Sequence, residues 1–298
     1  IPVQLDVYDL PMTNNELKQL VSAEKFTGYH SIIGPFRSEK VQLVAKTLKS
    51  DRIPIISPLT KSDVRLYRNL FQSRPDENIL EDLMLSYLNE LNEQHQITLL
   101  DDTFNKAEIA LLTGKIPSIN RISLNASGVI PTEAIDRVLS PTTVNTFVLS
   151  INDIPILNSV LRHLTGKLKT HQIQIVVLSP GKVYEDESIK PETLGKLHYT
   201  YPSISKEIVE SDPFVKNFQK TYQLIPNAYT VRGFDIMYDV LLRLSQGINI
   251  YDSLEKDYTT EYAASRFRYQ KKFLEGYTNT AAYILQYQPD LSVKVLNP

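Results

Sequence analysis

The chain has 298 residues, too many for one ordinary hydrophobic core, so two domains are expected. Its 32 basic and 34 acidic side chains leave a formal charge of −2, which removes the usual electrostatic support for nucleic-acid binding. It has no cysteine, which excludes disulfides and a cysteine nucleophile, and no apolar run approaches the ~20 residues needed to span a bilayer.

The N-terminal segment begins with a strand pattern followed by a helix pattern. Val3–Tyr8 alternates apolar and polar residues, which predicts a strand. Thr13–Glu16 reads TNNE, a capping box in which the glutamate can reach back to the threonine backbone. This box predicts a helix that runs to about Val21.

A strand–helix–strand unit comes next. Ser31–Ile33 and Ile53–Ile56 are short apolar runs, each stopped by a proline, and apolar residues recur at helical spacing between them. This length predicts two parallel, neighbouring strands. Ligands of open parallel sheets bind beyond the carboxyl ends of the strands, which here carry Gly34–Ser38 and Ser57–Ser62. The sequence therefore predicts a binding site at these two turns.

The remaining sequence continues the alternation of helices and strands. The predicted helices cover Pro75–Glu93, Thr132–Leu139, Ile154–Leu164, Pro213–Tyr222 and Tyr229–Ser245. The predicted strands cover Ile97–Leu100, Arg121–Leu124, Thr146–Ile151, Gln174–Leu178 and His198–Tyr201, with further β patterns at Arg266–Gln270, Ala282–Gln288 and Ser292–Leu296. Gly233 costs its helix about 1 kcal/mol relative to alanine, which a close backbone contact could compensate. The pattern is that of an α/β protein in two units.

Several motifs stand in the order of a known family. VYD at Val7–Asp9, IIGP at Ile32–Pro35 and IPIISP at Ile53–Pro58 come first. LFQSRP at Leu70–Pro75 and GFD at Gly233–Asp235 follow. In this order they resemble the type I periplasmic substrate-binding proteins, the leucine and branched-chain amino-acid receptor family of ABC importers. The resemblance covers nearly the whole chain.

This resemblance implies a specific architecture. It implies two doubly wound parallel-sheet lobes with a central cleft, joined by several chain crossings. Residues 1–75 and 228–265 would form the first lobe, and residues 76–227 and 266–298 the second. The family's first strand, which lies in the middle of its sheet, and the helix after it have no counterpart in this sequence. Upstream residues or another segment are expected to fill that place.

Three residues of the first lobe are candidate ligand contacts. Ser38 opens a helix, where its hydroxyl and neighbouring N–H groups could hold a carboxylate, and it could equally be an ordinary N-cap. Thr60 and Lys61 lie in the turn Thr60–Ser62 that follows the next strand, where the family holds the carboxylate or amine of its ligand. The alternative is a solvated loop in which Thr60 caps the chain ahead of Asp63.

Four residues of the second lobe complete the predicted site. Phe104 matches an aromatic of the family, although Asn105 stands where glycine is usual in that family. Phe104 could equally be a buried core residue. Asn152 ends another strand and could instead belong to the cap of the next helix. Gly181 or Lys182 stands where amino-acid receptors of the family carry an acid for the ligand ammonium, which argues against α-amino-acid specificity. Tyr184 could form an aromatic wall or be partly buried.

Enzyme chemistry has little support in the sequence. The five histidines show no metal-ligand spacing. Asp101 and Asp102 are neighbours in a strand and point to opposite faces, which argues against joint acid–base work. No catalytic or metal residue is assigned, and no cofactor is expected.

The sequence therefore predicts a non-enzymatic, periplasmic or otherwise extracytoplasmic solute-binding protein. It would capture a small, polar, amino-acid-like ligand for an ABC importer. The alternative is a ligand-sensing or protein-interaction module of the cell envelope that keeps the fold without amino-acid binding. The implied partners are an ABC permease in the first case and peptidoglycan-associated envelope proteins in the second.

Overall fold

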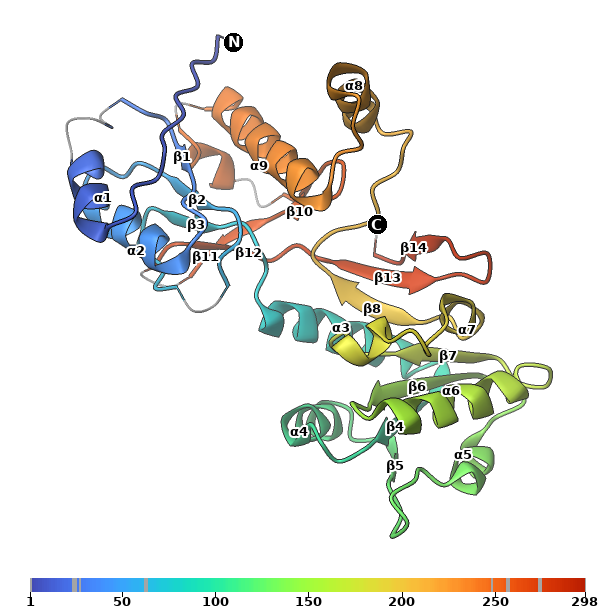
Figure 1. The fold of residues 1–298 in the computed structure, drawn as a ribbon. Helices are drawn as coiled ribbons and strands as arrows, with labels where there is room; N and C mark the ends of the chain where they lie inside the picture. The colour runs from blue at the N-terminus through green and yellow to red at the C-terminus, as the bar shows by residue number, and fades with distance from the viewer. Residues whose placement is uncertain are drawn as a thin grey trace. The chain divides into compact units, whose positions relative to one another are not determined.

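Two compact units make up the molecule, and the chain passes between them three times. Unit 1 contains Ile1–Asp76 and Ile204–Ala282, and unit 2 contains Glu77–Ser203 and Tyr283–Pro298. The computed structural model describes residues 2–22, 26, 28–61, 64–247, 249–255, 258–272 and 275–297. Figure 1 follows the elements along the chain by colour.

Unit 1 is built on a five-stranded sheet. Its strands, in spatial order, are β1 (Ile32–Ile33), β2 (Ile55–Ser57), β3 (Leu70–Gln72), β12 (Tyr277–Asn279) and β11 (Tyr269–Lys271). The first four are parallel and β11 is antiparallel to β12. The other elements are α1 (Asn14–Val21), α2 (Ser38–Thr47), α8 (Pro213–Tyr222), α9 (Ala228–Ser245), η3 (Asp252–Glu255), β9 (Thr260–Glu261) and β10 (Arg266–Phe267).

Alternation along the short strands gives the unit 1 sheet two apolar faces. Ile55 and Leu70 pack in one cluster with residues of α1 and α2. Ile56 and Phe71, the next residue of each strand, pack in a second cluster with residues of α9. Successive side chains of a strand point to opposite faces, so each strand anchors helices on both sides. The unit is therefore doubly wound.

Unit 2 is built on a seven-stranded sheet. Its strands, in spatial order, are β14 (Val293–Val295), β13 (Tyr283–Tyr287), β8 (Thr200–Ser203), β7 (Ile173–Val176), β6 (Val144–Ser150), β4 (His95–Asp101) and β5 (Asn120–Ser123). The five from β8 to β5 are parallel, and β13 and β14 extend the sheet antiparallel. Its helices are α3 (Glu77–Leu91), α4 (Lys106–Lys115), α5 (Thr132–Val138), α6 (Ile154–Lys167), η2 (Lys182–Glu185) and α7 (Pro191–Lys196).

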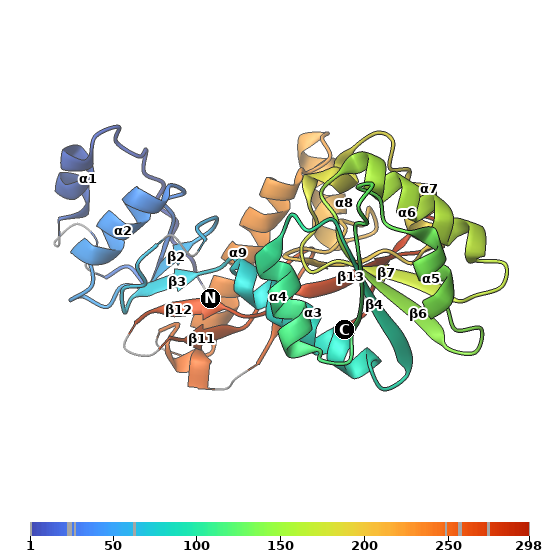
Figure 2. The ribbon, with the colours of Figure 1, turned by 90° about the horizontal axis from the view of Figure 1, so that it is seen from below.

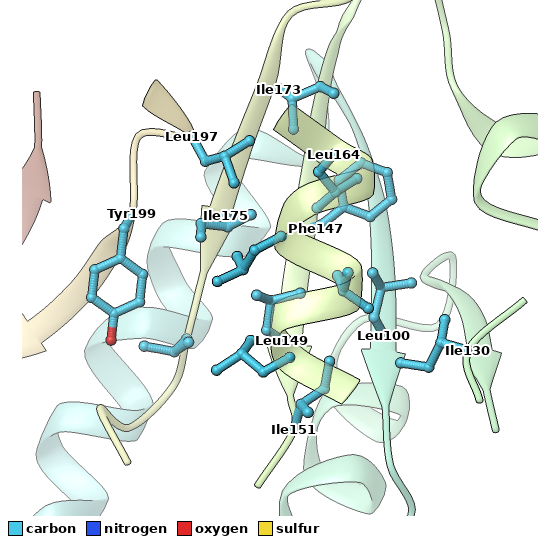
Figure 3. Close-up of a cluster of buried hydrophobic side chains, with 14 of the residues drawn as sticks. Leu100, Ile130, Phe147, Leu149, Ile151, Leu164, Ile173, Ile175, Leu197 and Tyr199 are labelled. Atoms are coloured by element: carbon cyan, nitrogen blue, oxygen red, sulfur yellow. The ribbon is translucent and has the colours of Figure 1, made fainter. Parts of the chain in front are cut away.

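Helices also cover both faces of the unit 2 sheet (Figure 2). One cluster joins the sheet to α3 and α4, and the other joins it to α5, α6 and α7. Figure 3 shows the second cluster, in which Leu164 of α6 packs with Phe147 and Leu149 of β6 and Ile175 of β7. The predicted class, α/β with two doubly wound units, is thus confirmed, and both sheets also carry antiparallel strands at one side.

Most predicted elements are found within a few residues of their expected bounds. The capping box is formed, because Thr13 accepts from the Glu16 N–H and the Glu16 carboxylate accepts from the Thr13 N–H. The predicted pairing of β1 and β2 is parallel and direct. The strand predicted at His198–Tyr201 begins at Thr200 instead, because His198 has a φ of 48°. Two helices, α4 and α7, were not predicted from the periodicity of the sequence.

One local prediction is wrong, and one possible contact is not found. Val3–Tyr8 forms no strand, and its apolar side chains are exposed, Val7 at 86%. An alternating sequence forms a strand only beside a partner, and no described strand lies on the outer side of β1. Gly233 has no close backbone contact, since a Cβ added there would meet nothing within 4 Å. Its cost to α9 is therefore not offset by packing at that position.

The unit boundaries differ from the expected lobes at two segments. Residues 204–227 and 266–282 belong to unit 1 rather than to the second unit. The β12 strand pairs in parallel with β3, and Ser205 bridges Ser265, so both segments are bonded to unit 1. In addition, Phe214 of α8 stacks on Phe234 of α9 with ring centroids 4.0 Å apart. Strand pairing and ring packing therefore determine where the chain crosses.

Candidate functional site

The carboxyl ends of the parallel strands in unit 1 are linked by buried polar side chains. The Ser57 and Thr60 hydroxyls lie 2.5 Å apart, and Gln72 donates to the Thr60 carbonyl at 3.0 Å. Ser73 donates to the Ser57 carbonyl at 2.8 Å, and Asn279 donates to the Ser73 carbonyl at 2.9 Å. This network holds the turns after β2, β3 and β12 at one edge of the sheet, the edge where ligands of parallel sheets bind.

A partly buried arginine from α9 joins the same edge. The Nε of Arg232 donates to the Pro58 carbonyl at 2.9 Å, and its Nη2 donates to the Ser73 hydroxyl at 3.2 Å. No carboxylate among the described residues forms an ion pair with it. Burial lowers the pKa of Arg232 and the like charge of Arg74 adds to this, while Tyr269 and Asp235 act in the opposite direction. Two cations that repel each other at a strand-end edge favour the arrival of an anion.

The nearest acid on its helix raises the pKa of Arg232 but forms no ion pair with it. Asp235 is fully buried, and its carboxylate accepts the backbone N–H groups of Ala263, Ala264 and Ser265 at 2.8–3.1 Å. Burial raises the pKa of Asp235 against these hydrogen bonds. The oxygens of Asp235 are thus committed to the chain that precedes β10, and the guanidinium remains available.

The predicted contacts of unit 1 lie around this edge with different exposures. Ser38 is the first residue of α2 and not its N-cap, which is Arg37 and makes no side-chain capping bond. Thr60 is 2% exposed and its hydroxyl contacts that of Ser57, so the solvated-loop interpretation is wrong for Thr60. Lys61 is exposed, and Ser62 lies outside the described residues.

The carboxyl edge of unit 2 carries the two neighbouring aspartates in separate roles. The Asp101 carboxylate accepts hydrogen bonds from Nε and Nη2 of Arg121 at 2.7 and 3.0 Å and from the Ser123 hydroxyl at 2.8 Å. Burial alone would raise the pKa of Asp101, but these hydrogen bonds outweigh burial and lower it. Asp101 therefore ties β4 to β5 as a carboxylate.

Asp102 binds the start of α6 instead. It accepts the N–H groups of Asn152 at 2.6 Å and Asp153 at 3.1 Å, and also the N–H of Phe104 at 3.0 Å. Asp153 in turn caps α6 by accepting from the Ile156 N–H at 2.9 Å. The expectation that the two aspartates do not act jointly agrees with these contacts.

A second acid, Glu108, lies next to this aspartate. Burial raises the pKa of Glu108 from about 4.5 to about 7, and the carboxylates of Glu81 and Asp102 add to the rise. Asn105 donates to the Glu108 carboxyl at 2.8 Å. The hydroxyl of Tyr184 is buried without a hydrogen-bond partner among the described residues, and burial, with Glu108 and Asp102 adding, raises the pKa of Tyr184.

The predicted contacts of unit 2 divide into exposed and buried residues. Phe104 is 76% exposed, which excludes the buried-core interpretation, and the residue before it, Thr103, has a φ of 63° that a β-branched side chain rarely adopts. Asn152 and Lys182 are also exposed. Tyr184 stacks on Tyr199 with ring centroids 4.8 Å apart and belongs to the apolar cluster of α6, so it is mainly a core residue.

The raised pKa of Glu108 predicts a pH-dependent stability. The unfolded chain loses this proton near pH 4.5 and the folded chain near pH 7, so stability should fall as the pH rises through this window. Glu108→Gln should remove this loss and be about 1–2 kcal/mol more stable than the wild type at about pH 8. Urea unfolding of both proteins across this pH range measures the difference.

Glu93→Gln, at an exposed glutamate just after α3, is the matched control and should follow the wild-type curve. Equal stabilities of Glu108→Gln and the wild type at every pH would contradict the assigned shift.

Two residues of these edges were missed in the sequence. Arg232 lies a little more than one turn into α9, and Glu108 is the third residue of a helix that was not predicted. The signal for Glu108 is the spacing Asn105-x-x-Glu108, since asparagine and glutamate at this spacing cap a helix start. No local signal places Arg232, because its partners Pro58 and Ser73 are distant in the sequence. Among the described residues, no three acids or histidines cluster as metal ligands.

The structure of the chain is similar to solved structures of known proteins. No protein-family model and no curated protein matches the chain. Among solved structures, it is similar to a putative branched-chain amino-acid ABC transporter protein from Rhodospirillum rubrum, with a TM-score of 0.58 and 12% identity over 96% of this chain and 85% of that chain. It is also similar to a branched-chain amino-acid ABC transporter periplasmic ligand-binding protein from Burkholderia xenovorans LB400, with a TM-score of 0.52 and 9% identity over 96% and 81%. The chain thus has the fold of type I periplasmic binding proteins.

Proposed function

We propose that this chain is a solute-binding protein that captures a small polar ligand carrying a carboxylate. The fold and the polar carboxyl edges of both sheets support the proposal, because such edges are where doubly wound proteins bind ligands.

The observation that carries the proposal is the state of Arg232. Arg232 is partly buried, and its guanidinium donates only to the uncharged Pro58 carbonyl and Ser73 hydroxyl. Arg74 is a like-charged neighbour. An anion that reached this guanidinium would form a charge-assisted hydrogen bond that the protein itself does not supply. Ser38, Thr60 and Lys61 lie on the same edge of unit 1 and are proposed to assist. Of these, the buried Thr60 would act by holding its turn.

Unit 2 supports an anionic ligand more than an α-amino acid. Lys182 lies at or next to the position where the resemblance places an acid, and burial favours the uncharged form of Glu108 up to about pH 7. The exposed ring of Phe104, with Asn152, offers a flat apolar surface beside polar groups. Tyr184 would support this surface from the core.

Delivery to an ABC importer outside the cytoplasm is part of the same proposal. The similar proteins of Rhodospirillum and Burkholderia are described as ABC transporter proteins, the second as periplasmic. No helix in the described part of the chain has the length and apolar character of a membrane span. An ABC permease is therefore the proposed partner.

Changing Arg232 tests the anion-binding role. We expect Arg232→Gln to weaken carboxylate binding by about 10–100-fold, since a charged hydrogen bond contributes about 1.5–3 kcal/mol. Arg232→Lys should retain part of the affinity. Isothermal titration with the best ligand of a carboxylate panel measures both.

Arg137→Gln, at an exposed arginine of α5, removes the same charge elsewhere and should bind as the wild type does. Wild-type affinity in a folded Arg232→Gln protein would refute the role of this residue.

A protein-interaction module of the cell envelope is the second candidate, and one surface favours it. Tyr222, Leu224, Ile225 and Tyr229, at and between α8 and α9, are 61–74% exposed. An apolar group of this kind is typical of a protein contact. Binding of an envelope protein that is lost in Tyr222→Ser/Ile225→Ser, with no response to any small solute, would favour this candidate.

A further inference from the structure

A cavity lies at the opposite edge of the unit 1 sheet from the ligand-binding edge proposed above. It has a volume of about 890 Å³. Its lining residues lie between α2 and β2 (Lys49, Ser50 and Arg52), directly before β3 (Arg68 and Asn69), at the end of β11 (Lys271), at the start of β12 (Tyr277) and directly before η3 (Tyr251). Since β2, β3 and β12 run parallel, these positions are at their amino ends (Figure 2). The cavity belongs to unit 1 alone.

All charged groups that line the cavity are cations. They are Lys49, Arg52, Arg68 and Lys271. None forms an ion pair with a described residue, and the acids next to them in the sequence, such as Asp51, do not line the cavity. The whole chain has a formal charge of −2, so this concentration of positive charge is local. Unpaired cations around a concave surface raise the local concentration of anions.

Aromatic rings form a fixed wall of the cavity. The rings of Tyr251 and Tyr277 have centroids 5.8 Å apart, and Tyr277 stacks on the fully buried Phe71 at 4.4 Å. The guanidinium carbon of Arg52 lies 5.2 Å from the centroid of the Tyr251 ring. The Tyr251 hydroxyl donates to the Arg52 carbonyl at 3.1 Å. One cation is therefore held in place before any ligand binds.

Two further features of the backbone and side chains lie at this cavity. Arg52 has a φ of 55°, in the left-handed region that residues other than glycine rarely adopt and that is frequent at binding sites. Asn69 lines the cavity and is 1% exposed, and its side-chain oxygen has no hydrogen-bond partner among the described residues. A buried acceptor is stabilised when a donor reaches it, such as a hydroxyl or a protonated phosphate oxygen.

We infer that this cavity binds a polyanion of the phosphate class. Four cations exceed what a single carboxylate needs, and the planar guanidinium groups of Arg52 and Arg68 match the geometry of phosphate oxygens. The volume is in the range of small-molecule sites rather than of single-ion sites. Two sources share this chemistry: a soluble polyphosphate-type ligand and the headgroups of anionic lipids. The site is independent of Arg232 and of the carboxylate ligand proposed above.

The test uses the complete chain and two probes at low ionic strength. Tripolyphosphate is titrated by calorimetry, and vesicles of phosphatidylcholine with and without phosphatidylglycerol are tested by co-sedimentation. Lys49→Gln/Lys271→Gln should weaken the probe that binds by at least about tenfold, because two charged contacts are lost. Lys18→Gln/Lys220→Gln removes the same charge from exposed positions of α1 and α8 and should change binding by less than about twofold.

Each outcome decides the inference. Binding of tripolyphosphate that depends on Lys49 and Lys271 supports a soluble ligand, and the same dependence for anionic vesicles alone supports a lipid headgroup. Binding of neither probe, or equal losses in the two double variants, would overturn the inference.

Discussion

Arg243→Met is expected to destabilise unit 1 by about 3–5 kcal/mol, because it leaves a buried carboxylate without its counter-ion. The Nε of Arg243 donates to Asp239 at 2.8 Å, and the two side chains are 2% and 1% exposed. Arg243 Nη2 also donates to the Phe267 carbonyl, and its guanidinium lies over the rings of Tyr258 and Tyr269. The arginine thus links α9 to β10 and to the strand after it.

Urea unfolding followed by far-ultraviolet circular dichroism measures this loss, and a second variant separates its causes. Asp239→Asn/Arg243→Met removes both charges, so it should recover part of the stability that Arg243→Met loses. Arg137→Met at an exposed position should stay within about 0.5 kcal/mol of the wild type. An Arg243→Met protein as stable as the Arg137→Met control would contradict the role given to the buried pair.

Gly195→Ala is the second change with a large expected effect, about 2–4 kcal/mol, and it acts on unit 2. A Cβ added to Gly195 of α7 would lie 2.4 Å from the carbonyl oxygen of Gln288 and 3.2 Å from its carbonyl carbon. Both are backbone atoms at the end of β13, so the clash cannot be relieved by rotating a side chain. Either α7 or the turn between β13 and β14 must move.

Gly166→Ala is the matched control, since a Cβ there would meet nothing within 4 Å and the residue lies in α6. It should leave stability unchanged or raise it by about 0.4–1 kcal/mol. Thermal unfolding of the two variants gives the comparison. Equal effects of the two substitutions would mean that the approach of α7 to Gln288 does not constrain the fold.

The fold was largely predictable from the sequence because its signals are local. The capping box at Thr13–Glu16, the paired apolar runs around Ile33 and Ile55, and the Asp212-Pro213 start of α8 each determine an element from neighbouring residues. The strand predicted at Val3–Tyr8 was wrong because strand formation depends on a partner that a periodicity does not reveal. The unit boundaries depend on long-range pairing, such as that of β12 with β3, and could not be read locally.

The candidate site was less predictable, for a related reason. The positions of Ser38 and Thr60 follow from strand ends, yet the burial of Thr60 depends on Ser57, Gln72 and the packing of the sheet. Arg232 reaches Pro58 across 174 residues of sequence. Such a contact depends on tertiary structure, so it cannot be predicted from composition or from the spacing of residues.

The central claim is that unit 1 binds a small carboxylate-bearing solute at the edge that carries Arg232. Its most direct test is calorimetric titration of the wild-type chain with a panel of small carboxylates, each paired with its uncharged carboxamide. We expect saturable binding of at least one carboxylate, and an affinity for its carboxamide that is lower by at least about tenfold. No binding across the panel, or equal affinity for carboxylate and carboxamide, would contradict it.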